Sequence, residues 1–120
     1  MIFLDFKKLF RSFKHAFSGI KWALKEEQNF RLQLIFGFLV LFLAVYFQVK
    51  TWELTALILT ILVVLVLELI NTIFEKFVDI LKPRVHHYVL VIKDLMAAAV
   101  LIASIGAIVI GLLIFLPYIL

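Results

Sequence analysis

The sequence contains no cysteine and only two prolines and four glycines among 120 residues. Without cysteine, the protein has neither disulfides nor thiolate metal sites. No run of proline, serine or glycine marks a linker, and we find no internal repeat and no signal peptide with a small-residue cleavage site. We therefore expect residues 1–120 to form a single domain.

The sequence also lacks the glycine-rich loops that bind phosphate in soluble proteins, the P-loop and the GxGxxG loop. Their absence excludes the usual soluble nucleotide-binding folds but leaves nucleotide binding by another kind of site open. Hydrophobic residues, in contrast, make up 66% of the chain. A soluble fold of this size cannot cover so much apolar surface, so the composition is typical of a membrane protein.

Three stretches are apolar and long enough to cross a bilayer as helices. Residues 32–49 and 95–120 carry no charge, and residues 52–81 form a longer apolar helix with a polar end. Ahead of them, residues 3–29 place apolar groups at steps of three and four with basic residues between, which predicts an amphipathic helix on an anionic membrane surface. The expected fold is an all-α integral membrane bundle of one surface helix and three transmembrane helices.

Basic residues are distributed unevenly along the chain. Eleven of the 12 Lys and Arg residues fall in residues 1–31 or around the second loop, whereas Lys50 alone lies in the first loop. Three spans put the amino-terminal helix and the second loop on one side of the membrane, and the positive-inside rule makes that side cytoplasmic. The carboxyl terminus is then expected outside the cell.

Polar side chains recur on one face of the second span. Residues 54–67 carry no charge, and four polar residues then follow at offsets of 0, 3, 7 and 11: Glu68, Asn71, Glu75 and Asp79. At about 100° per residue, these offsets return to nearly the same helix face. A charged residue at membrane depth costs about 2.5–3.5 kcal/mol even on lenient scales, and such residues are usually functional. The row therefore predicts a functional site.

Other charged residues fall near the same membrane surface. Glu26 and Glu27 end the surface helix, and Lys93 and Asp94 precede the third span. Mg²⁺ prefers carboxylate oxygens, usually one or two together with substrate phosphates, and lysine is a point charge suited to polyphosphate. This combination predicts a site that holds a metal nucleotide against a lipid head group.

Residues 68–79 (Glu-Leu-Ile-Asn-Thr-Ile-Phe-Glu-Lys-Phe-Val-Asp) resemble the signature of the prokaryotic diacylglycerol kinase family. Residues 93–100 resemble the family's second block, Lys-Asp followed by small residues, and residues 27–31 resemble a third landmark. The spacing agrees, and the resemblance covers nearly the whole chain. It implies a homotrimer in the bacterial cell membrane, with active sites between subunits at the cytoplasmic surface, that uses ATP and Mg²⁺ to phosphorylate a lipid hydroxyl. Nucleic acid is not an expected partner.

The resemblance implies roles for the acidic residues. By motif position, Glu68 is the candidate general base, or at least the group that positions the lipid hydroxyl. Glu27 and Glu75 match metal-binding carboxylates that also contact the nucleotide. Asn71 and Asp79 support this cluster, Asp79 without a defined role. Phosphoryl transfer depends mainly on positioning and charge neutralisation, so it needs little beyond these groups, a metal and a lysine.

The nucleotide contacts are assigned in the same way. Lys93 and Asp94 match nucleotide-binding positions, and the resemblance adds two histidines as candidates. His15 falls where other members have an aromatic nucleotide contact, and His86 lies in the second loop. Arg84 in that loop departs from the family pattern, in which an acidic residue is common.

Two further residues are assigned to the lipid substrate beside Glu68. Lys8 stands where some members have an arginine near the lipid head group, and Ala97 belongs to the small-residue block of the third span. Ile73 departs from the family signature, which has Ala or Ser there. A larger side chain at this position can alter packing against a neighbouring helix.

The main assignments each have a structural alternative. Glu68 and Glu75 can form hydrogen bonds between helices of a bundle without any catalytic role. Lys93 can anchor the third span by extending its amine to the membrane interface. Glu26 and Glu27 exchange roles if the alignment shifts by one residue.

The leading hypothesis is an ATP-dependent kinase for a membrane lipid alcohol, with undecaprenol favoured and diacylglycerol as the alternative. Residues 29–32 and 97–99 look more like the Gram-positive branch of the family, whose members mostly phosphorylate undecaprenol. A small proton-coupled transporter is a more remote alternative, because it predicts a carboxylate near the bilayer midplane rather than towards one end of a span. A structural subunit without catalysis is a third alternative, but it does not account for the row of polar residues at Glu68, Asn71, Glu75 and Asp79.

Overall fold

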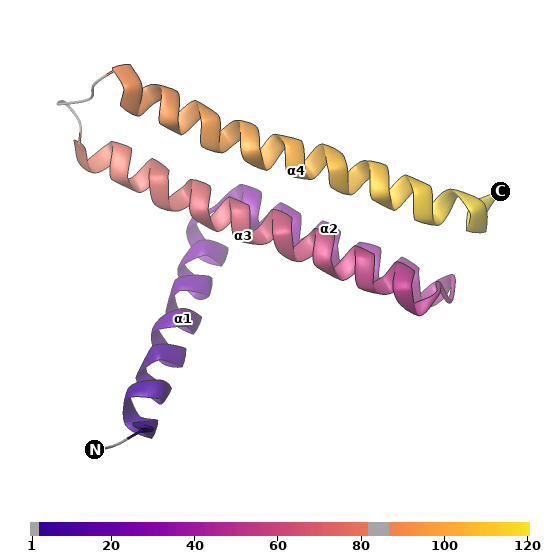
Figure 1. Cartoon of the computed structure of the whole chain (residues 1–120), viewed down its shortest axis with the longest axis horizontal. Coiled ribbons are helices and arrows are strands. Elements are labelled where there is room, and N and C mark those ends of the chain that lie inside the picture. The colour runs from indigo at the N-terminus through magenta and orange to yellow at the C-terminus, as the bar shows by residue number, and fades with distance from the viewer. Residues whose placement is uncertain (1–2, 82–86) are drawn as a thin grey trace.

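The computed structural model describes residues 3–81 and 87–120, which form four helices. These are α1 (Phe6–Glu26), α2 (Gln28–Tyr46), α3 (Thr51–Leu81) and α4 (His87–Ile119). Helix α3 packs against both α2 and α4, whereas α1 leaves the bundle at a steep angle (Figure 1). The all-helical architecture predicted from the sequence is confirmed.

Helices α2, α3 and α4 are each long and apolar enough to cross a membrane. The shortest, α2, has 19 residues and covers about 28 Å at about 1.5 Å per residue. Large apolar side chains remain exposed along all three helices, which suits a surface in contact with lipid. The chain is therefore a multi-pass membrane protein, with three apolar helices as predicted.

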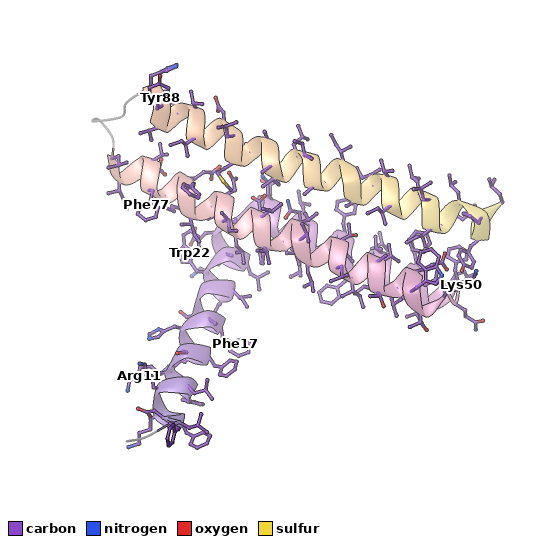
Figure 2. The ribbon with its side chains drawn as sticks, viewed as in Figure 1. Arg11, Phe17, Trp22, Lys50, Phe77 and Tyr88 are labelled. Carbon is purple, nitrogen blue, oxygen red and sulfur yellow. The ribbon has the colours of Figure 1, made fainter. Side chains whose placement is uncertain are left out.

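The surface helix predicted over residues 3–29 is interrupted in the structure. Helix α1 begins after Asp5, whose carboxylate accepts a hydrogen bond from the backbone N–H of Lys8 at 3.1 Å and so caps the helix. Glu27 takes an extended conformation, with φ −113° and ψ 107°, and separates α1 from α2. Figure 2 shows Arg11 and Phe17 on opposite sides of α1.

An arginine from α2 stabilises this break. Nη1 of Arg31 donates hydrogen bonds to the backbone carbonyls of Leu24 and Lys25, each at 2.9 Å. The last carbonyls of a helix have no partner within the helix itself. Arg31 supplies partners for two of them from outside, and it thereby ties the end of α1 to the start of α2.

Helix α4 is longer than the predicted third span. It begins at His87 rather than near residue 95, because residues 88–92 are apolar and contain no helix-breaking residue. Lys93 and Asp94 consequently lie within α4 instead of preceding it. Helix α2 ends early, at Tyr46, where Gln48 takes a left-handed conformation with φ 55° that turns the chain towards α3.

The three apolar helices pack closely at the end that carries the first loop. Ala44, Leu57, Ile114 and Phe115 form a buried cluster there, with one or more residues from each of α2, α3 and α4. Figure 2 labels Lys50 at this end of the bundle and Tyr88 at the opposite end. The cluster fixes the helices relative to one another far from the predicted acidic site.

Glu53 closes the same end of the bundle. Its carboxylate is 8% exposed and accepts hydrogen bonds from the backbone N–H of Lys50, at 2.9 Å, and from the hydroxyl of Tyr118. The bond to Lys50 is half of a capping box that starts α3. The bond to Tyr118 ties this start to the end of α4.

Candidate active site

Glu68 lies in α3 and is 3% exposed. Nε2 of Gln33, in α2, donates a hydrogen bond to Oε2 of Glu68 at 3.2 Å. The hydroxyl of Thr72 donates to the backbone carbonyl of Glu68 at 3.0 Å, within the same helix. Across residues 3–81 and 87–120, the Glu68 carboxylate therefore has a neutral amide, and no basic side chain, as its hydrogen-bond partner.

Asn71 and Glu75 continue the site along α3. Asn71 is 7% exposed, and its Nδ2 donates to Oε1 of Glu75 at 3.4 Å. Residues four apart are neighbours on a helix surface, so the backbone itself brings these two together. Glu75 is half-buried and Asp79, one turn further, is exposed. The polar stripe predicted from the sequence thus runs from the buried Glu68 to the exposed end of α3.

A third carboxylate approaches from outside α3. Glu27 occupies the break between α1 and α2, is half-buried, and its carboxylate does not cap α2. The charges of both Glu27 and Glu75 act on Glu68 and repel it. Glu26, the alternative considered from the sequence, is exposed. Glu75 of α3 and Glu27 of the α1–α2 junction therefore add negative charge in the neighbourhood of Glu68.

These carboxylates suit a metal that is held partly by phosphate. Among the described residues, no three or more Asp, Glu or His side chains lie close enough to hold a metal ion by themselves. Mg²⁺ commonly takes one or two carboxylates and completes its coordination with water and substrate phosphates. Glu27 and Glu75 are the two carboxylates that the sequence predicts for such a metal, and the described residues contain no metal cage built only of protein ligands.

Two buried amide oxygens of the site lack a donor. Oε1 of Gln33 and Oδ1 of Asn71 have no hydrogen-bond partner within the part of the chain that the structure describes. A buried acceptor without a donor costs about 1–3 kcal/mol. Both amides point their nitrogens at carboxylates, Glu68 and Glu75 respectively. Their oxygens are consequently available to a ligand that carries O–H groups or a metal ion.

The remaining predicted site residues lie apart from this cluster. Lys93 is half-buried and Asp94 and Ala97 are exposed on α4. No hydrogen bond or ion pair between described residues joins Lys93 or Asp94 to Glu68. The other candidates are exposed on α1, Lys8 and His15. His86 falls outside the described residues.

Gln33 is a site residue that the sequence analysis missed. It is a polar residue near the start of an uncharged predicted span. Polar side chains inside membrane helices tend to face other helices and to bond with them. This tendency could have marked Gln33 as a residue that contacts another helix. It does not identify Glu68 as the partner, because the two residues are 35 positions apart in the sequence.

An apolar groove adjoins the cluster. It measures about 570 Å³ and lies between α1 and the carboxyl-terminal part of α3, with Gly19 and Ile73 among its lining residues. At this junction, Nζ of Lys76 lies 5.3 Å from the centre of the Trp22 ring, within the range of a cation–π contact. Figure 2 shows Trp22 where α1 approaches α3. The groove is large and apolar enough to receive part of a hydrocarbon chain.

The chain is similar in sequence to bacterial lipid kinases. The family model described as prokaryotic diacylglycerol kinase matches residues 14–115. The chain is 35% identical over 107 residues to a diacylglycerol kinase of Synechocystis sp., covering 88% of this chain and 61% of that protein. It is 33% identical over 113 residues to the undecaprenol kinase of Bacillus subtilis, covering 94% of this chain and 92% of that protein.

A diacylglycerol kinase of Helicobacter pylori is 36% identical over 100 residues, covering 83% of this chain and 78% of that protein. The chain thus spans about three fifths of the length of the Synechocystis relative and most of the length of the other two. The names of these relatives specify two different lipid substrates at similar identity.

Proposed function

The chain belongs to the prokaryotic diacylglycerol kinase family, and on this basis we propose that it is an integral-membrane lipid kinase. It transfers the γ-phosphate of ATP to the hydroxyl group of a membrane lipid. We propose undecaprenol as the substrate and undecaprenyl phosphate as the product. The same single domain, residues 1–120, carries the membrane anchor and the catalytic site.

One observation carries this proposal beyond family membership. Glu68 is buried in an apolar helix, with Glu27 and Glu75 close enough to repel it and no basic side chain bonded to it among the described residues. Like charges in a low-dielectric site need compensation. The Mg²⁺ ion that accompanies ATP would supply positive charge beside these carboxylates, and the lipid hydroxyl would supply a hydrogen-bond donor for Glu68.

The residues have separate tasks in this scheme. Glu68 accepts the hydrogen bond of the lipid hydroxyl and takes its proton or orients it for attack on the γ-phosphorus. Glu27 and Glu75 would hold Mg²⁺, and Asn71 keeps Glu75 in place through its amide nitrogen. When bound, Mg²⁺ neutralises charge on the transferring phosphoryl group. The chain therefore contributes mainly positioning and charge, as phosphoryl transfer requires.

Residues of α4 complete the nucleotide-binding site. Lys93 is suited to pair with polyphosphate as a point charge, and Asp94 contributes beside it. Because neither bonds to Glu68 within one chain, we propose that a homotrimer forms the site between neighbouring copies. The exposed apolar surface of the three spans is compatible with such packing.

The site faces the cytoplasm in this proposal. Eleven of the 12 Lys and Arg residues lie on the side of α1 and the second loop, which the positive-inside rule makes cytoplasmic. Helix α1 then lies along the inner membrane surface, with its basic residues towards the anionic head groups. ATP reaches the cluster from the cytoplasm, while the lipid reaches it from the bilayer through the apolar groove.

The choice of undecaprenol rests on the extent of similarity. The Bacillus subtilis undecaprenol kinase matches over nearly the full length of both chains, whereas the Synechocystis protein is matched over 61% of its length. Residues 29–32 and 97–99 also favour that branch. Diacylglycerol remains the second candidate, since two of the relatives described above carry that name.

Label transfer from γ-labelled ATP tests the proposal. The purified full chain in detergent micelles or bilayers is supplied with Mg²⁺ and either undecaprenol or diacylglycerol. We expect the label in undecaprenyl phosphate, with slower labelling of diacylglycerol. Faster labelling of diacylglycerol would reverse the substrate assignment, and no transfer to either lipid would remove the kinase proposal.

A further inference from the structure

We propose that Gln33 is a positioning residue for lipid phosphorylation, which holds the Glu68 carboxylate in the orientation that receives the acceptor hydroxyl. This inference rests on the proposed function and extends its site to a helix, α2, whose side chains had no role in it. The supporting features are the hydrogen bond between the two side chains, the burial of Glu68, and the buried, unpaired oxygen of the half-buried Gln33.

The hydrogen bond restrains one oxygen of the carboxylate and leaves the other available. Nε2 of Gln33 lies 3.2 Å from Oε2 of Glu68, and Oε1 of Glu68 makes no hydrogen bond within the described residues. A glutamate side chain rotates about three bonds, so an untethered carboxylate samples several orientations. A single donor from a neighbouring helix reduces this freedom and leaves Oε1 to meet the lipid hydroxyl.

The orientation of the amide follows from charge. An ionised carboxylate is an acceptor only, so the amide of Gln33 must present its nitrogen to Glu68. Because the amide is planar, its oxygen Oε1 then faces away from the carboxylate. That oxygen is buried and has no partner among the residues described. It is placed to accept a hydrogen bond from a ligand at the same site.

A purely structural role accounts less well for this arrangement. Helix α2 already packs against α3 through apolar contacts, including Gly37 against Ile61. An apolar side chain at position 33 would pack there without leaving a buried oxygen unpaired, which costs about 1–3 kcal/mol. A glutamine that leaves this oxygen unpaired and bonds the candidate base is better explained by the chemistry of Glu68.

Gln33→Met tests the inference, because methionine preserves length and volume but removes both hydrogen-bonding groups. The full chain is assayed in detergent with Mg²⁺, ATP and the lipid alcohol that the wild type phosphorylates best. We expect kcat to fall about 10- to 100-fold through misplacement of Glu68. The KM for Mg²⁺–ATP should stay within about two-fold of the wild type, since Gln33 is not among the residues that we propose to bind the nucleotide.

Thr60→Val provides the matched control. It also deletes a polar group from the bundle, but among the described residues the hydroxyl of Thr60 bonds only to the carbonyl of Ala56 in its own helix. We expect wild-type kinetics from this variant. If Gln33→Met does not fold, Gln33→Asn replaces it, because the shorter amide withdraws from Glu68 while the helix keeps a polar residue at this position.

Two results would overturn the inference while leaving the kinase proposal intact. One is a kcat of Gln33→Met within about two-fold of an active wild type. The other is a loss of kcat accompanied by an equal rise in the KM for Mg²⁺–ATP and a lower melting temperature, which indicates damaged packing. An inactive wild type would instead remove the proposed function, and the role of Gln33 with it.

Discussion

Gly37 of α2 faces Ile61 of α3 so closely that a β-carbon at position 37 would lie 2.9 Å from Cγ2 of Ile61. Gln33 lies one helical turn before Gly37, and Glu68 lies two turns beyond Ile61, so the same helix faces carry the packing contact and the hydrogen-bonded pair. The approach of the two backbones at Gly37 therefore sets the distance across which Gln33 reaches Glu68.

Gly37→Ala should separate the two helices. The branched side chain of Ile61 has little rotamer freedom in a helix, so it cannot move aside easily. We expect the free energy of unfolding to fall by about 1–3 kcal/mol, as for other overpacked sites, together with a reduced kcat. Unfolding in mixed micelles measures the first effect. Ile61→Ala in the same chain should relieve the clash, and equal stability of Gly37→Ala and the wild type would contradict this account.

Glu68→Gln should abolish turnover without unfolding the protein. The amide keeps the shape of the side chain but cannot accept a proton, and loss of a general base typically costs about 10²–10⁴-fold in rate. Label transfer to the lipid measures the rate, and size-exclusion chromatography checks that the oligomeric state is unchanged. Glu26→Gln is the control, since Glu26 is exposed and should leave activity intact. Wild-type turnover by Glu68→Gln would remove Glu68 from the catalytic role.

Glu75→Gln should change the dependence on Mg²⁺. Removing one of two proposed metal-binding carboxylates weakens coordination, so a higher Mg²⁺ concentration is needed for half-maximal activity, by about ten-fold or more. Glu27→Gln should act in the same direction. Titration of activity with Mg²⁺ at saturating ATP and lipid gives the shift. An unchanged titration in either variant would exclude that residue as a metal ligand.

Gly19→Leu should weaken binding of the lipid. A β-carbon at position 19 meets no atom within 4 Å, so the leucine fits without a clash, yet its side chain enters the apolar groove. We expect a KM for the lipid raised about ten-fold, through loss of buried apolar contact, and an unchanged KM for Mg²⁺–ATP. Ser18→Leu adds the same bulk to an exposed neighbour outside the groove. Equal lipid KM values for the two variants would exclude this groove as the lipid route.

The acidic stripe could be predicted from the sequence because it depends on a single helix. The spacing of Glu68, Asn71 and Glu75 requires only helical periodicity, and the structure places all three along α3, with Glu68 and Asn71 buried and Glu75 half-buried. The position of Glu27 could not be predicted from helical periodicity alone, because Glu27 lies at a break in the helix predicted over residues 3–29. Lys93 and Asp94 were grouped with the cluster from the sequence, but within one chain no described hydrogen bond links them to it.

The sequence by itself determined the class of this protein, its three spans and its family, because apolar length, the distribution of basic residues and a short polar signature are properties of local segments. The tertiary structure alone decided which residues meet across helices: Gln33 with Glu68, Gly37 with Ile61, and Glu53 with Tyr118. The reason is physical. A membrane helix is apolar on nearly every face, so its sequence carries little periodic signal for its rotation and register against a neighbour.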